Sequence, residues 1–396
     1  MLAKSRKDGA DATRCVHAGE ERHRTNAPLT TPIVQTSVFV LQNFEELRRY
    51  AEGKSEAYLY TRYGNPTTTA AEKKIAALED AEDCVLTASG MAAEMATLLA
   101  ICESGDEIVS MLDLYGGTVK LFDTVMPRMG IRVRLVSFSE LSKVEPFFTS
   151  QTRVLFLETP TNPTLRCADI GALSEIAHRH NAQVVVDNTF ATPILQKPLT
   201  LGADIVIHSA TKYLGGHNDL TAGAVVGARR WIDTIREMTK YTGGCPDPGT
   251  SYLLIRGLKT LDIRVQRGCA NAAKVAEALK RNPKVKRVIY PGLAENESYE
   301  LAARQMKEFG MIVSFEIKGE QRAAAKFIDA LKVWYLAASL GGVESTVSYP
   351  LLSSHVGLSE KQLKLLDVSA GTVRLSVGIE DSADLIADLE QALSKV

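Results

Sequence analysis

Short apolar runs alternate with helix-like stretches between residues 71 and 228. Apolar runs of about four to eight residues bounded by turn residues are typical of buried strands. Alternation of strands with helices predicts an open, mostly parallel α/β sheet, with the run 222–228 placed at its edge. We expect strands beginning at Cys84 and Val154, further strands at 107–112, 132–137, 182–188, 204–209 and 222–228, and helices at 71–78, 140–148 and 169–180.

The rest of the chain predicts an N-terminal arm and a second domain. Residues 1–58 have no long periodic pattern apart from a short helix at 44–50. Residues 59–250 hold the predicted sheet and end in a glycine- and proline-rich loop at 240–250. Residues 251–396 are expected to form a smaller α+β domain, with a linking helix at 251–281, strands at 285–290, 311–317, 333–337 and 371–379, and helices at 298–308, 321–330 and 382–394.

Composition narrows the class of protein. The chain has 396 residues, enough for two or three domains at about 150 residues each. Its 46 basic and 47 acidic residues argue against a general nucleic-acid or membrane-surface partner. It has no apolar run near the roughly 20 residues of a membrane span, no secretory signal, and six cysteines without a C-x-x-C pair. We therefore expect a cytoplasmic protein with free thiols and no metal site.

Lys212 follows one of the apolar runs, directly after a cluster of small polar residues that includes Ser209 and Thr211. Hydroxyls and backbone N–H groups of such a cluster can hold a phosphate. The amine can form a Schiff base with a carbonyl compound. Taken alone, the pattern is equally compatible with a lysine that leaves a strand for solvent.

Asp187 ends the neighbouring apolar run. Because the carboxyl ends of parallel strands meet at one edge of a sheet, Asp187 and Lys212 are expected to face the same pocket. A lysine that forms a Schiff base and an aspartate on a pyridinium nitrogen are the pair that pyridoxal phosphate (PLP) requires. The alternative for Asp187 is a turn or cap residue after a strand.

Further residues suit a flat, phosphorylated cofactor. Arg62 could bind a phosphate with help from the Tyr60 hydroxyl, or it could stack on tyrosines in a surface turn. Gly90 and Met91 open a predicted helix, whose free N–H groups favour an anion, although small residues are also common at ordinary strand-to-helix turns. Tyr115 could stack on a ring or simply begin a helix.

Two residues are candidates for substrate binding. Asn162 could hydrogen-bond the cofactor ring oxygen or a substrate carboxylate, or it could be a turn residue beside proline. Arg374 lies among apolar neighbours in the predicted strand 371–379. A buried arginine needs a carboxylate partner, which either a substrate or a protein acid could supply.

The segment Ser209–His217, Ser-Ala-Thr-Lys-Tyr-Leu-Gly-Gly-His, resembles the cofactor-lysine motif of the Cys/Met metabolism family of PLP enzymes. Residues Tyr60–Thr67 match a second family pattern, Tyr-x-Arg-x-x-Asn-Pro-Thr. The resemblance runs from about Cys15 to the C-terminus. It implies an α/β PLP-dependent transferase-like fold (fold type I), PLP as cofactor and small amino-acid substrates.

The resemblance also implies roles for individual positions. Lys212, Tyr115 and Asp187 would be catalytic, with Tyr60 and Arg62 reaching the PLP phosphate of a partner subunit. The N-terminal arm would wrap a neighbour, and a homotetramer built from two dimers is expected. Cofactor-binding residues would be Tyr60, Arg62, Gly90, Met91, Tyr115, Asp187, Ser209, Thr211 and Lys212, and substrate-binding residues Asn162, Ser339, Glu344 and Arg374.

Two positions bear on which reaction is catalysed. Gly116 stands where methionine γ-lyases carry a cysteine, by resemblance. Glu344 matches a Leu-Gly-Gly-x-Glu-Ser pattern of cystathionine-type enzymes and would suit the distal amino group of cystathionine or cysteine, or it is a solvated loop acid. Both favour a cystathionine γ-synthase or γ-lyase. Alternatives are an O-acylhomoserine sulfhydrylase, a methionine γ-lyase, a cystathionine β-lyase, an aminotransferase, or a PLP-binding protein without turnover.

Overall fold

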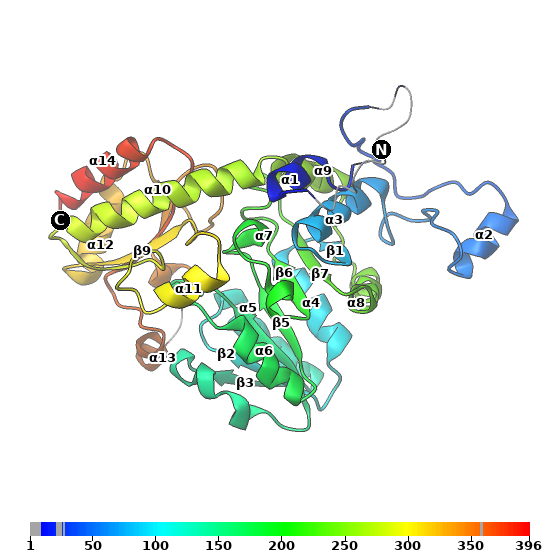
Figure 1. Ribbon diagram of the computed structural model, residues 1–396, viewed down its shortest axis with the longest axis horizontal. Coiled ribbons are helices and arrows are strands. Elements are labelled where there is room, and N and C mark those ends of the chain that lie inside the picture. Colours follow the sequence, from blue (N-terminus) through cyan, green and yellow to red (C-terminus); the bar gives the residue numbers. More distant parts are fainter. Residues whose placement is uncertain (1–8, 21–25, 27, 357–358) are drawn as a thin grey trace.

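The computed structural model describes residues 9–20, 26, 28–356 and 359–396, and its strands form two sheets (Figure 1). The larger sheet has seven strands in the order β1-β7-β6-β5-β4-β2-β3. These strands are β1 (Asp83–Thr87), β2 (Glu107–Met111), β3 (Arg132–Val136), β4 (Thr152–Glu158), β5 (Gln183–Asp187), β6 (Ile205–His208) and β7 (Gly223–Gly227).

The sheet is mostly parallel, as the alternating pattern predicts. Strands β3, β2, β4, β5 and β6 pair in parallel, whereas β7 is antiparallel to both of its neighbours, β1 and β6. The prediction that 222–228 forms an edge strand is wrong, because β7 lies between β1 and β6. Its five residues are all buried, which its apolar composition allows.

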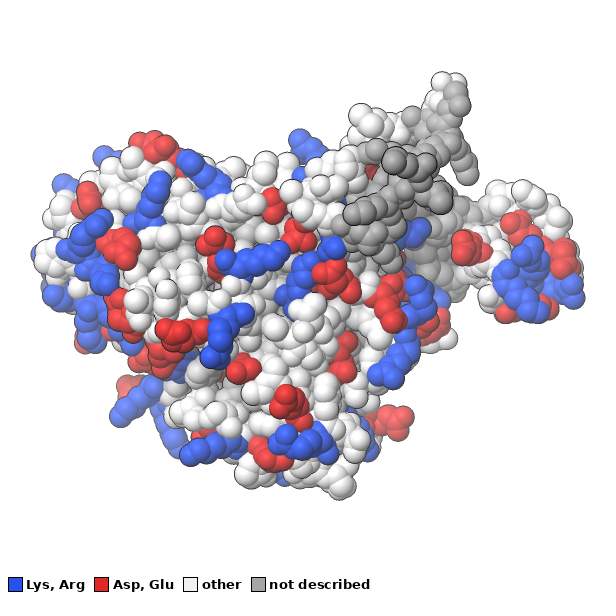
Figure 2. All heavy atoms as spheres, viewed as in Figure 1, with Lys and Arg blue, Asp and Glu red and all other residues white. Residues whose placement is uncertain are grey.

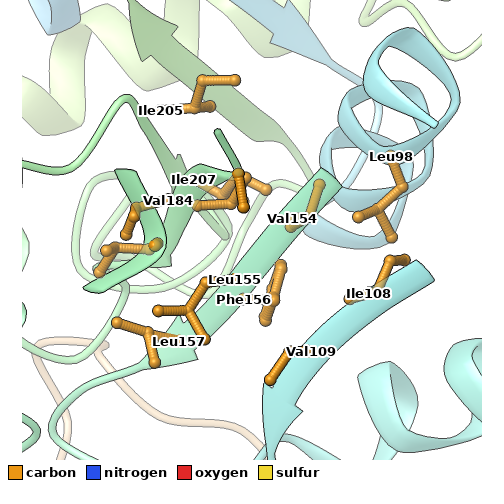
Figure 3. Packing of buried hydrophobic residues seen from close by; sticks show 14 of the residues in the cluster. Leu98, Ile108, Val109, Val154, Leu155, Phe156, Leu157, Val184, Ile205 and Ile207 are labelled. Carbon is orange, nitrogen blue, oxygen red and sulfur yellow. The ribbon is translucent and has the colours of Figure 1, made fainter. Parts of the chain in front are cut away.

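Helices cover the faces of this sheet, and the core lies between sheet and helices. Figure 3 shows β4 with Val154, Leu155, Phe156 and Leu157, beside side chains of β2, β5 and β6. Strands buried on both faces have nearly continuous apolar sequences, which is why these runs were recognisable. The helices include α3 (Pro66–Leu78), α4 (Gly90–Ile101), α6 (Ile170–Arg179) and α8 (Arg229–Thr242).

Several helix predictions need correction. Residues 140–148 form two short 3-10 helices, Phe138–Lys143 and Glu145–Phe147, because Pro146 has no N–H to continue an α-helix. The loop predicted at 240–250 is shorter in the structure, because α8 extends to Thr242 and the next helix begins at Pro248. Helix α8 itself was not predicted.

The predicted linking helix 251–281 is two helices. They are α9 (Pro248–Leu258) and α10 (Leu261–Arg281). The guanidinium of Arg264 donates to the carbonyl of Gly257 (2.8 Å), so a side chain occupies an acceptor that a continuous helix would use. In Figure 1, α10 runs along the upper side of the molecule, from the larger sheet to the C-terminal helix.

The smaller sheet has five strands in the order β10-β11-β12-β9-β8. The helices predicted at 298–308, 321–330 and 382–394 are confirmed, with shifted ends. The three-residue β11 was not predicted, because so short a run carries no periodic signal. The elements are β8 (Val285–Ile289), α11 (Tyr299–Gln305), β9 (Ile312–Ile317), α12 (Glu320–Ala330), β10 (Tyr335–Leu336), β11 (Thr346–Ser348), α13 (Glu360–Leu365), β12 (Thr372–Ser376) and α14 (Ser382–Leu393).

The N-terminal segment differs from a purely irregular arm. Helix α1 (Asp11–His17) packs on α3 and α10, whereas α2 (Phe44–Ala51) lies on an arm that projects from the body (Figure 1). The buried amine of Lys74 donates to the carbonyls of Cys15 (2.9 Å) and Val16 (3.2 Å), and this anchors α1. Burial lowers the pKa of Lys74 to about 8.

The surface carries charges of both signs without segregation over the face seen in Figure 2. This mixture agrees with the near-zero net charge of the chain. None of the helices in the described ranges has the length and apolar character needed to cross a membrane.

Candidate active site

A cavity of about 780 Å³ opens at the carboxyl ends of the parallel strands. Glu158 from β4 and Asp187 from β5 lie on its wall together with Lys212, which follows β6. Ala338 and Arg374, from the part of the chain that forms the smaller sheet, also line the cavity. Strand ends in an open parallel sheet are the usual place for a ligand.

Lys212 projects into this cavity. Its amine donates to the hydroxyl of Ser339 (2.9 Å), a residue of the C-terminal domain. Burial, and secondarily the charge of Arg374, lower the pKa of Lys212. A lowered pKa increases the neutral fraction of the amine, and the neutral form is the nucleophile.

Asp187 lies on the same cavity, so the predicted convergence with Lys212 is confirmed. Its strand, β5, is the direct parallel neighbour of β6. The carboxylate accepts a hydrogen bond from the backbone N–H of Thr189 (2.9 Å). Burial raises the pKa of Asp187, while the hydrogen bonds from Thr189 and the charge of His208 act in the opposite direction.

One end of the cavity suits a phosphate. Helix α4 begins there, with Ser89 as its cap accepting from the N–H of Ala92 (3.1 Å). Gly90 packs against Ser209 so closely that a Cβ on Gly90 would lie 2.9 Å from the Ser209 Cβ. Met91 and Thr211 also line this end. Free N–H groups and the dipole of a helix N-terminus favour an anion.

Tyr115 lies at the cavity mouth, between the end of β2 and the short helix α5 (Gly116–Lys120). Its backbone N–H donates to a carboxyl oxygen of Glu158 (2.6 Å). The position of the Tyr115 ring requires glycine at position 117, because a Cβ on Gly117 would lie 2.4 Å from a ring carbon. About half of the tyrosine is exposed, so its face is available to a ligand in the cavity.

Arg374 and Asn162 meet on the opposite wall. A guanidinium N–H of Arg374 donates to the amide oxygen of Asn162 (2.9 Å), and another to the carbonyl of Ser339 (3.3 Å). Its Nε has no hydrogen-bond partner among the described residues. Burial lowers the pKa of Arg374 to about 10. Both observed acceptors are neutral, so within the described part of the chain no carboxylate pairs with this buried cation, and a substrate could supply one.

Four predicted residues are not among those that line this cavity: Tyr60, Arg62, Ser339 and Glu344, although Ser339 contacts Lys212. Arg62 donates to the carbonyl of Lys240 (2.5 Å) and stacks 4.8 Å from the ring centroid of Tyr63 and 5.5 Å from that of Tyr60. This is the surface arrangement described above as the alternative for Arg62 and Tyr60. Glu344 accepts from the amide of Asn218 (2.8 Å) and likewise lies outside the lining residues.

The cavity contains acids that the sequence analysis missed. Glu158 pairs in register with Asp187, and burial together with the charge of Asp187 raises its pKa well above the usual value. Glu94 from α4 accepts from Thr118 (2.9 Å), and burial likewise raises its pKa. Glu158 ends an apolar run just as Asp187 does, so the same signal could have revealed it.

Comparisons with known proteins define the class. Residues 12–394 match the family described as Cys/Met metabolism PLP-dependent enzyme. An L-methionine γ-lyase of Fusobacterium nucleatum subsp. polymorphum is 44% identical over 387 residues, covering 97% of this chain and 98% of the relative. A chloroplastic cystathionine γ-synthase of Nicotiana tabacum is 43% identical over 391 residues, covering 98% of this chain and 72% of the relative.

A solved structure supports the same class. The cystathionine γ-lyase of Lactobacillus plantarum, complexed with L-serine, superposes with a TM-score of 0.92 at 37% identity, covering 98% of this chain and 99% of the other. The fold is therefore that of fold type I PLP enzymes. The chain belongs to the Cys/Met metabolism family of PLP-dependent enzymes.

The residues present fit PLP. Lys212 and Asp187 share one cavity with the helix N-terminus at Gly90, and Tyr115 stands at its mouth. With PLP bound, Lys212 would meet its aldehyde, Asp187 its ring nitrogen, the helix N-terminus its phosphate and Tyr115 its ring face.

Proposed function

We propose that this is a trans-sulfuration enzyme that forms or cleaves cystathionine, either as a cystathionine γ-synthase or as a cystathionine γ-lyase. The family is shared by enzymes with several names, and identities of 44% and 43% to a methionine γ-lyase and a cystathionine γ-synthase do not separate them. The choice among them therefore rests on the cavity. An O-acylhomoserine sulfhydrylase is the second candidate, since the same site could use a smaller thiol.

The observation that carries the proposal is the packing of Gly116. A Cβ built on Gly116 would lie 2.1 Å from the carbonyl oxygen of Ser354, and this oxygen belongs to the backbone. The cysteine that methionine γ-lyases carry there, by the resemblance stated above, would not fit without moving the loop. At the mouth of this cavity, the backbone of Ser354 leaves room at position 116 only for glycine. Glu344 lies outside the lining, so its contact with a distal amino group remains a prediction.

The proposed chemistry divides among the residues of the cavity. Bound PLP supplies an electron sink for the carbanion at the substrate Cα. Asp187 holds the proton on the cofactor ring nitrogen, and Arg374 with Asn162 and Ser339 holds the substrate carboxylate. Lys212 removes the proton at Cα and transfers protons at Cβ, with Tyr115 assisting near the leaving group. In the lyase direction, cysteine would leave from Cγ and hydrolysis would release 2-oxobutanoate and ammonia. In the synthase direction, the acyl group would leave as a carboxylate and the thiol of cysteine would add at Cγ to give cystathionine.

We also propose that the active unit is at least a dimer and that two dimers form a tetramer. Tyr60 and Arg62 lie outside the cavity of their own chain, which is compatible with their reaching a partner's cofactor phosphate. The adjoining arm exposes apolar side chains at Leu29, Val40 and Phe44. A partner subunit would bury them.

Product analysis by mass spectrometry tests the proposed function. PLP-saturated enzyme would receive cystathionine, L-methionine, or O-acylhomoserine with cysteine and sulfide in competition. Formation of 2-oxobutanoate and cysteine from cystathionine would identify a γ-lyase, and accumulation of cystathionine in the third mixture a γ-synthase. Homocysteine without cystathionine would favour the sulfhydrylase. Faster release of methanethiol from methionine than turnover of cystathionine would contradict the proposal.

Replacing Gly116 with alanine should perturb both stability and the cavity mouth. The added methyl group meets the Ser354 carbonyl, so either the loop or α5 must shift, at a cost of about 1–3 kcal/mol. Thermal unfolding and the KM for cystathionine measure the two effects. Gly171→Ala is the matched control, because a Cβ there makes only ordinary contacts at 3.6 Å. Equal behaviour of the two variants would show that Gly116 is not sterically required.

A further inference from the structure

One cavity residue has no part in the chemistry described so far. His355 lies in the loop that follows the 3-10 helix Pro350–Leu352. Its side chain lines the same cavity as Lys212. It is 4% exposed, although the loop around it reaches the surface at Leu352 and Val356. Its backbone N–H donates to the carbonyl of Pro350 (2.9 Å), so the loop turns back on itself and points the imidazole inward.

The imidazole is hydrogen-bonded through Nδ1, which lies 2.8 Å from the hydroxyl of Ser354. On its other side, the backbone of Asn162 acts as a hydrogen-bond partner that raises the pKa of the ring. Burial, reinforced by the charge of Arg374, lowers the pKa of His355 to about 4, so the ring is neutral at pH 7. A neutral ring that donates to the Asn162 backbone accepts at Nδ1 from the Ser354 hydroxyl.

These contacts connect three parts of the site. Asn162 belongs to the loop after β4, and its amide oxygen accepts from Arg374 of β12, 212 residues away in the sequence. Ser354 holds its carbonyl against Gly116, beside Tyr115. His355 therefore contacts the backbone of Asn162, whose side-chain amide accepts from Arg374, and at the same time the segment that narrows the cavity mouth. A neutral side chain suits this position, since a second cation would repel the guanidinium.

We propose that His355 is a positioning residue that holds Asn162 and Arg374 in the geometry for gripping the substrate carboxylate. The inference rests on the proposed role of Arg374 at that carboxylate, but not on which trans-sulfuration reaction is catalysed. It predicts a defect specific to ligands that carry a carboxylate. If His355 only stabilised the fold, its substitution would lower the affinity of the cavity for all ligands alike.

The test compares two amines that differ only by the carboxylate. L-Alanine and ethylamine are titrated into the PLP-loaded enzyme, and binding is measured from the change in cofactor absorbance. Neither compound has a γ-substituent, so the measurement is independent of the turnover reaction. Arg374→Ala serves as the reference for loss of the grip. We expect His355→Ala to lower the affinity for L-alanine about tenfold or more and to leave the affinity for ethylamine within about twofold of the parent value.

Two further variants separate positioning from folding. His355→Gln keeps a neutral N–H donor for Asn162 and should restore much of the L-alanine affinity. Ser354→Ala removes only the hydroxyl partner of the ring and should give an intermediate loss. Unchanged L-alanine binding in His355→Ala, or equal weakening of both amines in His355→Ala and His355→Gln, would overturn the proposal. If Arg374→Ala itself left L-alanine binding unchanged, the assigned carboxylate site would fail and this inference with it, whatever the product analysis shows.

Discussion

Replacing Lys212 with alanine is expected to abolish the covalent attachment of PLP and to reduce turnover by at least about 10³-fold. The amine of Lys212 lies in the cavity, next to Ser339 of the other domain. No other residue is assigned both to attach the cofactor and to move the proton at Cα. Absorbance of the bound cofactor and turnover of cystathionine measure the two losses separately.

The controls distinguish the nucleophile from the charge. Lys212→Arg keeps a cation at the position but cannot attach the cofactor, so it should be as inactive as the alanine variant. Lys143→Ala, at an exposed position, should behave as the parent enzyme. A Lys212→Ala protein that retained both the cofactor band and turnover would refute the assignment of Lys212.

The second large effect is expected for Asp187→Asn. Asparagine has nearly the same shape but cannot hold the cofactor ring nitrogen in its protonated form, so the electron sink weakens. We expect kcat to fall by about 10²–10³-fold, with a shifted cofactor absorbance and little change in L-alanine binding. Single-turnover kinetics under PLP saturation would measure the chemical step directly.

Glu158→Gln is the matched control for this substitution. Glu158 lies in register with Asp187 on the neighbouring strand, and burial together with the charge of Asp187 raises its pKa well above the usual value. Glutamine preserves a neutral acceptor for the N–H of Tyr115. We expect kcat within a few-fold of the parent value. A loss as large as that of Asp187→Asn would show that the charge is not confined to Asp187.

The comparison between Asp187 and Glu94 shows how far the residue pattern could reveal this site. Asp187 terminates an apolar run, and the ends of parallel strands converge at one edge, so a local pattern was enough to place it. Glu94 lies inside an Ala- and Leu-rich helix, where the sequence does not say which side faces a cavity. Helix α8 was missed although its buried residues Ile232, Ile235 and Thr239 recur at helical spacing. The division between α9 and α10 accompanies a tertiary contact, from Arg264 of α10 to the Gly257 carbonyl, that no local pattern reveals.

The sequence by itself determined the alternating α/β fold, the cofactor and the pair Lys212 and Asp187. These features depend on local runs and on motifs within short segments. Only the tertiary structure decided that Gly116 faces the Ser354 carbonyl and that His355 supports Asn162 and Arg374. Such contacts join residues that are far apart in the chain, and they depend on how the segments around the smaller sheet pack against the larger sheet. No periodicity or spacing within a segment carries that information.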